Sequence, residues 1–239
     1  MREYTIHPLV VGANETDQGI MTYLKDYGRR IWIPIYVFVI RGGDRNIIVD
    51  TGLSDFVVPE EVGRTYGLDI LPFEEALATQ GLAPDKIDLI IHTHLHNDHC
   101  ENDQLCENAA VLVQKREMDF FRAPHPLDHR YYPDVLDGVN VTEIDGDCEL
   151  FDGVSVILTP GHTPGGQSVC VNTAKGKAVI TGFCCNEKNF PAVGPAVCPG
   201  VHTDPLAGYD SAQRIKAMKP EFLLPLHDLS VGRHRTIPY

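Results

Sequence analysis

A cluster of histidines directly after a short apolar segment constrains this chain of 239 residues more than any other feature. The segment Ile87-Asp88-Leu89-Ile90-Ile91 is apolar apart from one aspartate, which predicts a short buried strand. The next eight residues, His92-Thr93-His94-Leu95-His96-Asn97-Asp98-His99, contain four histidines and one aspartate. Histidine is uncommon in proteins, and it clusters with aspartate chiefly at metal sites. The sequence therefore predicts a metal site at the carboxyl end of this strand.

The spacing within the cluster indicates how its side chains divide. If the strand runs to about residue 94, His94 and His96 are two residues apart and project from the same side of it. Neutral imidazoles on one rigid face suit a borderline-soft divalent metal ion. Asp98 and His99 follow in the turn, where successive side chains diverge, so they can serve a second ion beside the first. His92 is one step off this pattern, and we expect it to pack or hydrogen-bond behind the site.

Three other positions are candidates to complete the site. His162 lies after a predicted strand in the turn Thr-Pro-Gly-His-Thr-Pro-Gly-Gly, where proline and glycine make the backbone stiff. His227 directly follows the last predicted strand. Either histidine alone is typical of a polar turn, but two at the carboxyl ends of strands indicate ligands brought in from distant sequence. For Asp50, in Val-Asp-Thr-Gly, two interpretations stay open: a common turn residue, or a carboxylate that orients a ligand histidine.

The order of these motifs resembles that of the metallo-β-lactamase superfamily. An Asp-Thr-Gly comes first, then His-x-His-x-Asp-His, then Gly-His-Thr-Pro-Gly and finally a late Leu-His. The resemblance implies an α/β fold, an αββα sandwich of two mixed β-sheets flanked by helices, in a single domain over residues 1–239. It implies one metal ion among His94, His96 and His162. It implies the other ion among Asp98, His99 and His227.

Within that superfamily the chain looks most like the N-acyl homoserine lactonase branch, on residues 93–100, 159–168 and 187–190. The resemblance implies a hydrolase that opens a lactone or a related small cyclic or ester substrate. One or two divalent ions, zinc first and iron or manganese as alternatives, would lower the pKa of a water molecule. Asp98 would carry its proton to the leaving group. The alternatives are thioester hydrolysis of the glyoxalase II type and a metal-binding protein that senses a ligand without turnover.

The chain departs from the family pattern where a bridging aspartate is expected. Family members carry Thr-Gly-Asp after a strand, but here Thr-Gly is followed by Phe183, which cannot bind a metal ion. The lactonases place a tyrosine three residues later, where this chain has Asn186. Either Cys184 or Cys185 replaces the aspartate as a thiolate ligand, with Cys184 favoured because it is closer to the expected position, or both are small buried hydrophobic residues. In the second case the second metal site is weaker, or the two ions are bridged only by water.

The segment from 122 to 138 is dense in Pro, His, Asp and Tyr and is too long for a plain connection. We therefore interpret it as a functional loop over the site. Its Tyr131 and Tyr132 are candidates to take the place of the missing tyrosine at the substrate. Packing within a lid is the alternative for both.

Strand and helix signals alternate along the rest of the chain. Strands are predicted at 32–40, 46–49, 87–91, 109–113, 154–158, 168–171, 178–181 and 222–226, and helices at 73–80, 115–121 and 210–218. Gly42-Gly43-Asp44 predicts a hairpin between the first two strands. This order favours two sheets packed face to face with helices outside.

Composition narrows the partners and the compartment. The net charge is −13, and no basic cluster is present, which disfavours nucleic-acid substrates. The longest apolar run, residues 31–40, is about half as long as a membrane-spanning helix must be. Seven cysteines without regular spacing fit reduced thiols better than a disulfide framework. We therefore expect a soluble cytoplasmic protein that acts on a small molecule.

Overall fold

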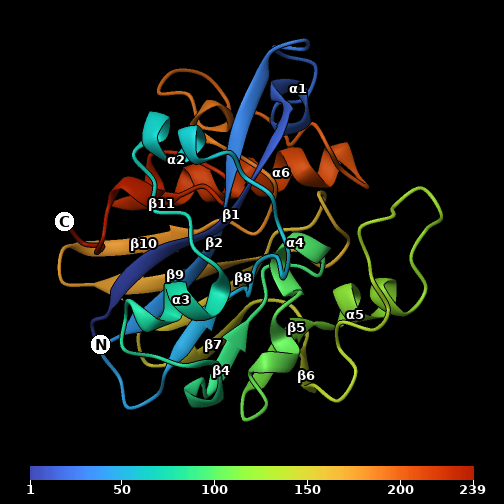
Figure 1. The fold of residues 1–239 in the computed structure, drawn as a ribbon. Helices are drawn as coiled ribbons and strands as arrows, with labels where there is room; N and C mark the ends of the chain where they lie inside the picture. Colours follow the sequence, from blue (N-terminus) through green and yellow to red (C-terminus); the bar gives the residue numbers. More distant parts are fainter.

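Two β-sheets lie at the centre of the computed structural model, which describes residues 1–239, and the helices surround them (Figure 1). The first sheet has six strands in sequence order: β1 (Thr5–Asp17), β2 (Arg30–Arg41), β3 (Ile47–Val49), β4 (Leu89–Ile91), β5 (Ala110–Gln114) and β6 (Asn140–Ile144). The second sheet has five strands in spatial order: β11 (Phe222–Leu224), β10 (Gly176–Ile180), β9 (Gln167–Thr173), β8 (Val154–Leu158) and β7 (Cys148–Phe151). Both sheets are mixed, because β3 to β6 and the β10–β11 pair run parallel and the other pairs run antiparallel.

The helices are short except for the last. They are α1 (Gln18–Met21), α2 (Glu60–Tyr66), α3 (Phe73–Ala78), α4 (Asn97–Cys100), α5 (Lys115–Arg122) and α6 (Pro205–Met218). Four 3-10 helices complete the chain: η1 (Pro84–Lys86), η2 (Asp103–Leu105), η3 (Glu187–Asn189) and η4 (Val231–Arg233). None of the helices combines the length and the hydropathy that crossing a lipid bilayer requires.

The apolar core has one layer between the sheets and one on each outer face. Alternate residues of β2 show why the layers form, since Tyr36 and Phe38 pack between the sheets while Ile35 and Val37 pack on the opposite face. That outer layer is covered by α3 and α5, and the outer face of the second sheet is covered by α6. Each fully buried aliphatic side chain contributes about 1.5–3 kcal/mol. Burial on both faces explains the continuous apolar run in β2.

The predicted αββα architecture is therefore confirmed. The hairpin at Gly42-Gly43-Asp44 joins β2 and β3 as predicted, and β8 has the predicted bounds. The 13-residue strand β1 was not predicted, because Pro8, Gly12 and its polar end interrupt the apolar pattern. β1 is an edge strand, where proline is tolerated, and its register shifts between Val10 and Gly12.

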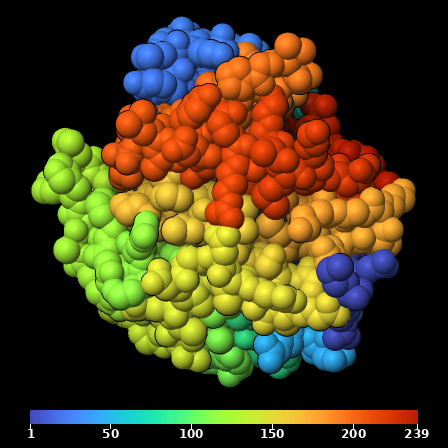
Figure 2. Space-filling model, turned by 180° about the vertical axis from the view of Figure 1, so that it is seen from behind, coloured from blue at the N-terminus to red at the C-terminus, as the bar shows by residue number.

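Two segments far apart in sequence lie side by side at one end of the molecule. The turn after α1 and the segment near residue 200 appear in Figure 2 as adjacent blue and orange regions. Tyr23 N donates a hydrogen bond to Cys198 O (2.9 Å), and Val201 N donates one to Ile20 O (2.9 Å). Val201 in turn contacts His162, so this pair of segments borders the histidine cluster.

Candidate metal centre

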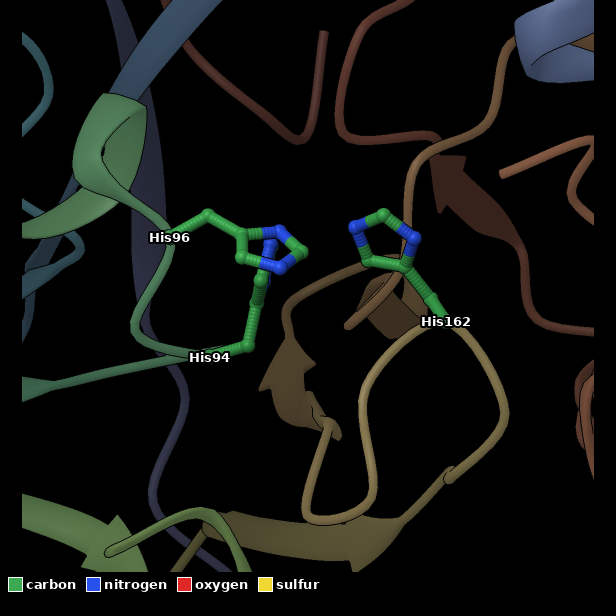
Figure 3. Close-up of side chains that lie close together, drawn as sticks. All are labelled: His94, His96 and His162. Atoms are coloured by element: carbon green, nitrogen blue, oxygen red, sulfur yellow. The ribbon is translucent and has the colours of Figure 1, made fainter. Parts of the chain in front are cut away.

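The structure brings the predicted ligands together in two groups. One potential ligand atom from each of His94, His96 and His162 lies within 4.8 Å of the others. His94 and His96 come from the segment after β4 and His162 from the turn between β8 and β9, and their rings point toward one another (Figure 3).

The second group consists of Asp98, His99 and His227, with the same mutual limit of 4.8 Å between ligand atoms. Asp98 Oδ2 lies 3.5 Å from His99 Nε2 and 3.9 Å from His227 Nε2. The rings of His94 and His99 are 4.2 Å apart between centroids, so the two groups are neighbours. All five histidines are buried, whereas the carboxylate of Asp98 keeps about one fifth of its surface exposed.

Each histidine contacts the rest of the protein through one ring nitrogen. Nδ1 makes the contact in four of them, with these partners: Thr93 Oγ1 for His94, Asp50 Oδ2 for His99, Val201 O for His162 and Pro34 O for His227. His96 is reversed, since its Nε2 lies 3.2 Å from Asp128 Oδ2. The other nitrogen of each ring is thereby left for a metal ion.

Two of these nitrogens indicate that a ligand fits here. Nε2 of His94 and Nε2 of His99 are buried and have no hydrogen-bond partner. Buried polar atoms in native proteins nearly always have a partner, so an unpartnered pair within one cluster requires an explanation. Imidazole nitrogens with one carboxylate are a donor set that zinc, iron and manganese accept. The residues present therefore fit two divalent ions.

Electrostatics keeps three of these rings in the neutral form that binds a metal. Burial, reinforced by neighbouring histidines, holds the pKa values of His94 and His162 well below 6.5. Burial also lowers the pKa of His227 to about 4. Burial alone would raise the pKa of Asp98, but His99 and His227 outweigh it and lower that pKa. At neutral pH His94, His162 and His227 thus offer neutral imidazoles, and Asp98 offers an ionised carboxylate. His99 differs, because burial lowers its pKa but Asp98 and Asp50 outweigh burial and raise it.

A second layer of polar groups lies behind the cluster. Asp50 adopts the left-handed backbone conformation (φ +60°) and accepts hydrogen bonds from Thr93 N (2.7 Å), Thr93 Oγ1 (2.7 Å) and His99 Nδ1 (2.8 Å). His92 lies behind the site, where it was predicted, between Asp50 (3.3 Å) and Asp103 (2.7 Å). Burial lowers the pKa of His92, but Asp103 and Asp50 outweigh it and raise it to about 10. Asp50 thus binds Nδ1 of His99, a candidate ligand, which is the contact expected of a carboxylate that orients such a ring.

One detail of the predicted geometry is wrong. The strand β4 ends at Ile91, so His94 and His96 lie in the loop after it rather than on a strand face. The strand ends because the groups that follow bind elsewhere: Thr93 N donates to the Asp50 side chain and Thr93 O accepts from Gln167 N. The two histidines still converge because that loop is fixed by these bonds.

Glu117 is a site residue that the sequence analysis missed. Its buried carboxylate accepts hydrogen bonds from Leu95 N (3.0 Å), Gly165 N (3.0 Å) and the Tyr131 hydroxyl (2.8 Å). Glu117 thus joins the His94–His96 loop, the His162 turn and the loop at 122–138. The sequence feature that could have identified it is its spacing from Phe121, because residues four apart share one face of a helix and this places the Glu117 carboxylate on the buried face of α5.

The tyrosines of the loop at 122–138 differ in position. Tyr131 is buried, and its ring packs edge-on against the His96 ring at 4.9 Å between centroids. Its hydroxyl is already bound to Glu117, so it does not point freely at a substrate. Tyr132 is 43% exposed and forms no hydrogen bond with the two ligand groups.

The residues after β10 explain what stands where a bridging aspartate was expected. The Phe183 ring packs under α6 with Ile215 and Phe190 and not among the histidines. Cys184 is buried with its Sγ 3.5 Å from Met21 Sδ, and its thiol belongs to neither ligand group. Burial raises the pKa of Cys184, which disfavours a thiolate. Asn186 caps η3 and bonds to Gln18, so it does not replace a substrate-facing tyrosine.

Comparison with known proteins agrees with this geometry. The sequence model of the metallo-beta-lactamase superfamily matches residues 30–227. An N-acyl homoserine lactonase from Bacillus sp. is 27% identical over 204 residues, which are 80% of this chain and 76% of that protein.

Solved structures agree as well. The crystal structure of a quorum-quenching N-acyl homoserine lactone lactonase has a TM-score of 0.76 and 25% identity, over 96% of this chain and 94% of that one. A probable metal-dependent hydrolase from Staphylococcus aureus, 21% identical, shares the fold with a TM-score of 0.75, over 100% of this chain and 97% of that one. This chain therefore belongs to the metallo-beta-lactamase superfamily, as a hydrolase close to the N-acyl homoserine lactonases.

Proposed function

We propose that the chain uses divalent metal ions to hydrolyse a lactone or a related small cyclic or ester substrate. The observation that carries the proposal is the pair of ligand groups, in which buried imidazole nitrogens without partners meet one partly exposed carboxylate. The similarity to N-acyl homoserine lactonases supports a lactone as the substrate class.

In this proposal His94, His96 and His162 would hold one ion, and Asp98, His99 and His227 the other. Zinc suits these donors best, and iron or manganese are the alternatives. When bound, the ions supply a water molecule whose pKa is near neutrality and a Lewis acid that polarises the substrate carbonyl. The protein supplies the fixed ring orientations, through Asp50 and the backbone carbonyls that bind the opposite ring nitrogens.

Asp98 would move the proton. Hydrolysis adds a water oxygen to the carbonyl carbon, breaks the bond from that carbon to the ring oxygen, and delivers one proton to the departing oxygen. Asp98 is ionised at neutral pH, lies within the cluster and is the one member of it with substantial exposure. Its carboxylate can therefore accept the proton of the attacking water and give it to the leaving oxygen.

A small substrate panel tests the proposal. Zinc-loaded protein is expected to open neutral acyl homoserine lactones and simple lactones faster than it cleaves matched thioesters or β-lactams. If thioesters are cleaved faster than lactones, the function is thioester hydrolysis and not lactone hydrolysis. Full metal occupancy without turnover of any member of the panel would indicate a metal-binding protein that senses a ligand.

We expect purified protein to carry at least one divalent ion, because the first ligand group is preformed. Elemental analysis measures the content. Replacing both His94 and His162 by alanine should abolish binding at this group, whereas His125→Ala, at an exposed position of the loop at 122–138, should leave it intact. Protein that takes up no zinc, manganese or iron at neutral pH would overturn the assignment.

Metal-free protein should lose stability in mild acid. Burial holds the pKa values of His94 and His162 below 6.5 and that of His227 at about 4, so the unfolded chain binds protons that the folded chain does not. The free energy of unfolding should therefore decrease as the pH falls from about 6.5 toward about 4. The raised pKa of His92, about 10, contributes stability that is complete below 6.5 and is lost as the pH rises toward about 10, so it does not compensate here.

Urea denaturation of EDTA-treated protein at several pH values measures this effect. The double variant His94→Gln/His162→Gln should show a shallower decrease, and the exposed control His125→Gln should not differ from the unchanged protein. A denaturation midpoint that stays constant or rises on acidification contradicts the prediction.

A further inference from the structure

We propose that Arg130 forms a subsite for a carboxylate of the substrate, beside the metal centre. The inference rests on the proposed hydrolase function, because it names a feature of the substrate of that same site. It makes the preferred substrate an anionic lactone or ester, with a carboxylate near the bond that is broken.

The backbone of Arg130 is fastened to the ligand loop. Asn97, which lies between His96 and Asp98, donates a hydrogen bond from its backbone N to Arg130 O at 2.8 Å. The next residue, Tyr131, packs its ring against His96. Residue 130 thus has a fixed position relative to both ligand groups, although it belongs to a segment without helix or strand.

The Arg130 side chain is held by one edge of its guanidinium group. Nε and Nη2 bind the two carboxylate oxygens of Asp128 at 2.7 and 2.8 Å. Asp128 is itself 7% exposed and also contacts His96 Nε2 at 3.2 Å. The guanidinium is therefore linked through Asp128 to a predicted metal ligand, and its orientation is set before any substrate arrives.

This arrangement leaves a second edge of the guanidinium free. An arginine carries five N–H groups, and Asp128 takes two of them. The edge formed by Nη1 and Nη2 retains two parallel N–H groups, a geometry that matches the two oxygens of a carboxylate. The side chain is 35% exposed, so a ligand can reach it.

The charge of Arg130 acts on the metal centre. After burial and His96, Arg130 is the next group that lowers the pKa of His162. It also acts to lower the pKa values of Asp98 and of Cys184, where burial is the largest influence. His162, Asp98 and Cys184 come from three separate segments around the cluster, so a charge that acts on all three lies next to the cluster.

A carboxylate is the anion favoured by this environment. The chain carries a net charge of −13, so its overall field does not attract anions, and recognition must come from a local contact. A single arginine edge of two N–H groups provides that contact for one carboxylate. An uncharged substituent would leave these N–H groups with weaker partners, so the site should prefer a substrate with a carboxylate.

The test compares two lactones of equal size, one with a carboxylate substituent and one with the corresponding carboxamide. Zinc-loaded protein is expected to prefer the carboxylate in kcat/KM by about tenfold to a hundredfold, the range of hydrogen bonds to charged groups. In Arg130→Gln the ratio of the two kcat/KM values should fall to about one, and Arg130→Lys should retain part of the preference. The control Arg122→Gln, an exposed arginine that pairs with Glu143, should keep the full ratio.

Binding without turnover gives an independent measurement. Calorimetry with dicarboxylates from malonate to adipate, and with their monoamides, should show tighter binding of one dicarboxylate, and Arg130→Gln should lose that difference. Hydrolysis of lactones with no preference for the charged one, and no difference in binding, would overturn the subsite and leave the proposed function standing. Absence of hydrolysis together with an Arg130-dependent difference in binding would overturn the function and support the subsite. A preference for phosphate monoesters over carboxylates would show that the anion was misassigned.

Discussion

Asp98→Asn is expected to lower turnover of a lactone at least about a hundredfold at saturating zinc, the usual scale for loss of general acid–base catalysis. Asparagine keeps the size of the side chain but cannot accept and release the proton. The neighbouring histidines lower the pKa of Asp98, so the carboxylate is ionised at neutral pH and able to take a proton from water. Steady-state kinetics with metal content measured on the same samples checks this expectation.

Metal content is needed because Asp98 also belongs to the second ligand group. The first group contains no atom of Asp98, so one ion per chain should remain in the variant. Asp134→Asn makes the same chemical change at an exposed position of the loop at 122–138 and should leave both turnover and metal content unchanged. Normal turnover by Asp98→Asn with full metal occupancy would show that another group carries the proton.

Local motifs made most of the candidate ligand set predictable. His94, His96, Asp98 and His99 lie within six consecutive residues, so their proximity is fixed by chain connectivity. His162 and His227 could be added because each follows a strand and the carboxyl ends of strands gather at one edge. The αββα fold was predictable for a related reason, since the alternating apolar segments define the strands that the two sheets contain.

The groups that hold those ligands in place were harder to predict. Glu117 joins three segments through hydrogen bonds to Leu95, Gly165 and Tyr131, and these partners are separated by up to 70 residues in the chain. No spacing rule relates them, because the contacts depend on how α5 docks against two loops. The position of Arg130 was equally hard to predict, because it depends on a tertiary contact with Asn97.

The strand β1 and the residues after β10 show a second limit of prediction from sequence, because tertiary packing overrides the local pattern there. β1 is stabilised by its long antiparallel pairing with β2, which overrides the interruptions in its own apolar pattern. Phe183 occupies the expected sequence position of an aspartate, but a ring of that size gains more from the core under α6 than from a polar cluster. The backbone therefore directs it away from the histidines, and the two ligand groups contain neither Phe183 nor Cys184.

Asp50→Ala is expected to destabilise the protein by about 3–5 kcal/mol, the cost of removing one partner from a buried ionic network. Asp50 is fully buried and accepts hydrogen bonds from the backbone N–H and the hydroxyl of Thr93 and from His99, and His92 Nδ1 lies 3.3 Å from it. Without it, these donors stay buried without an acceptor. Burial raises the pKa of Asp50, but His99 and His92 outweigh it and lower it to about 2.

The direction of that shift fixes the conditions of the measurement. Because the folded-state pKa is below the ordinary value of 3.8, the stabilisation is complete above that pH and is lost as the pH falls toward about 2. Chemical denaturation at pH 7 should therefore show the full difference between Asp50→Ala and the unchanged protein, and the difference should shrink in strong acid. Part of the cost, about 1–2 kcal/mol, comes from placing alanine in the left-handed conformation at this position.

Asp50→Asn separates the charge from the backbone strain. Asparagine tolerates the left-handed conformation and can still accept from Thr93 N through its amide oxygen, so its stability should lie between the other two proteins. It cannot orient His99 as an anion does, so zinc affinity at the second group should fall about tenfold to a hundredfold even in the folded variant. The opposite outcome is a free energy of unfolding of Asp50→Ala within about 1 kcal/mol of that of the unchanged protein, the value of a single ordinary hydrogen bond, with two zinc ions bound equally well by both variants. Asp50 would then be a turn residue and not the support of the metal centre.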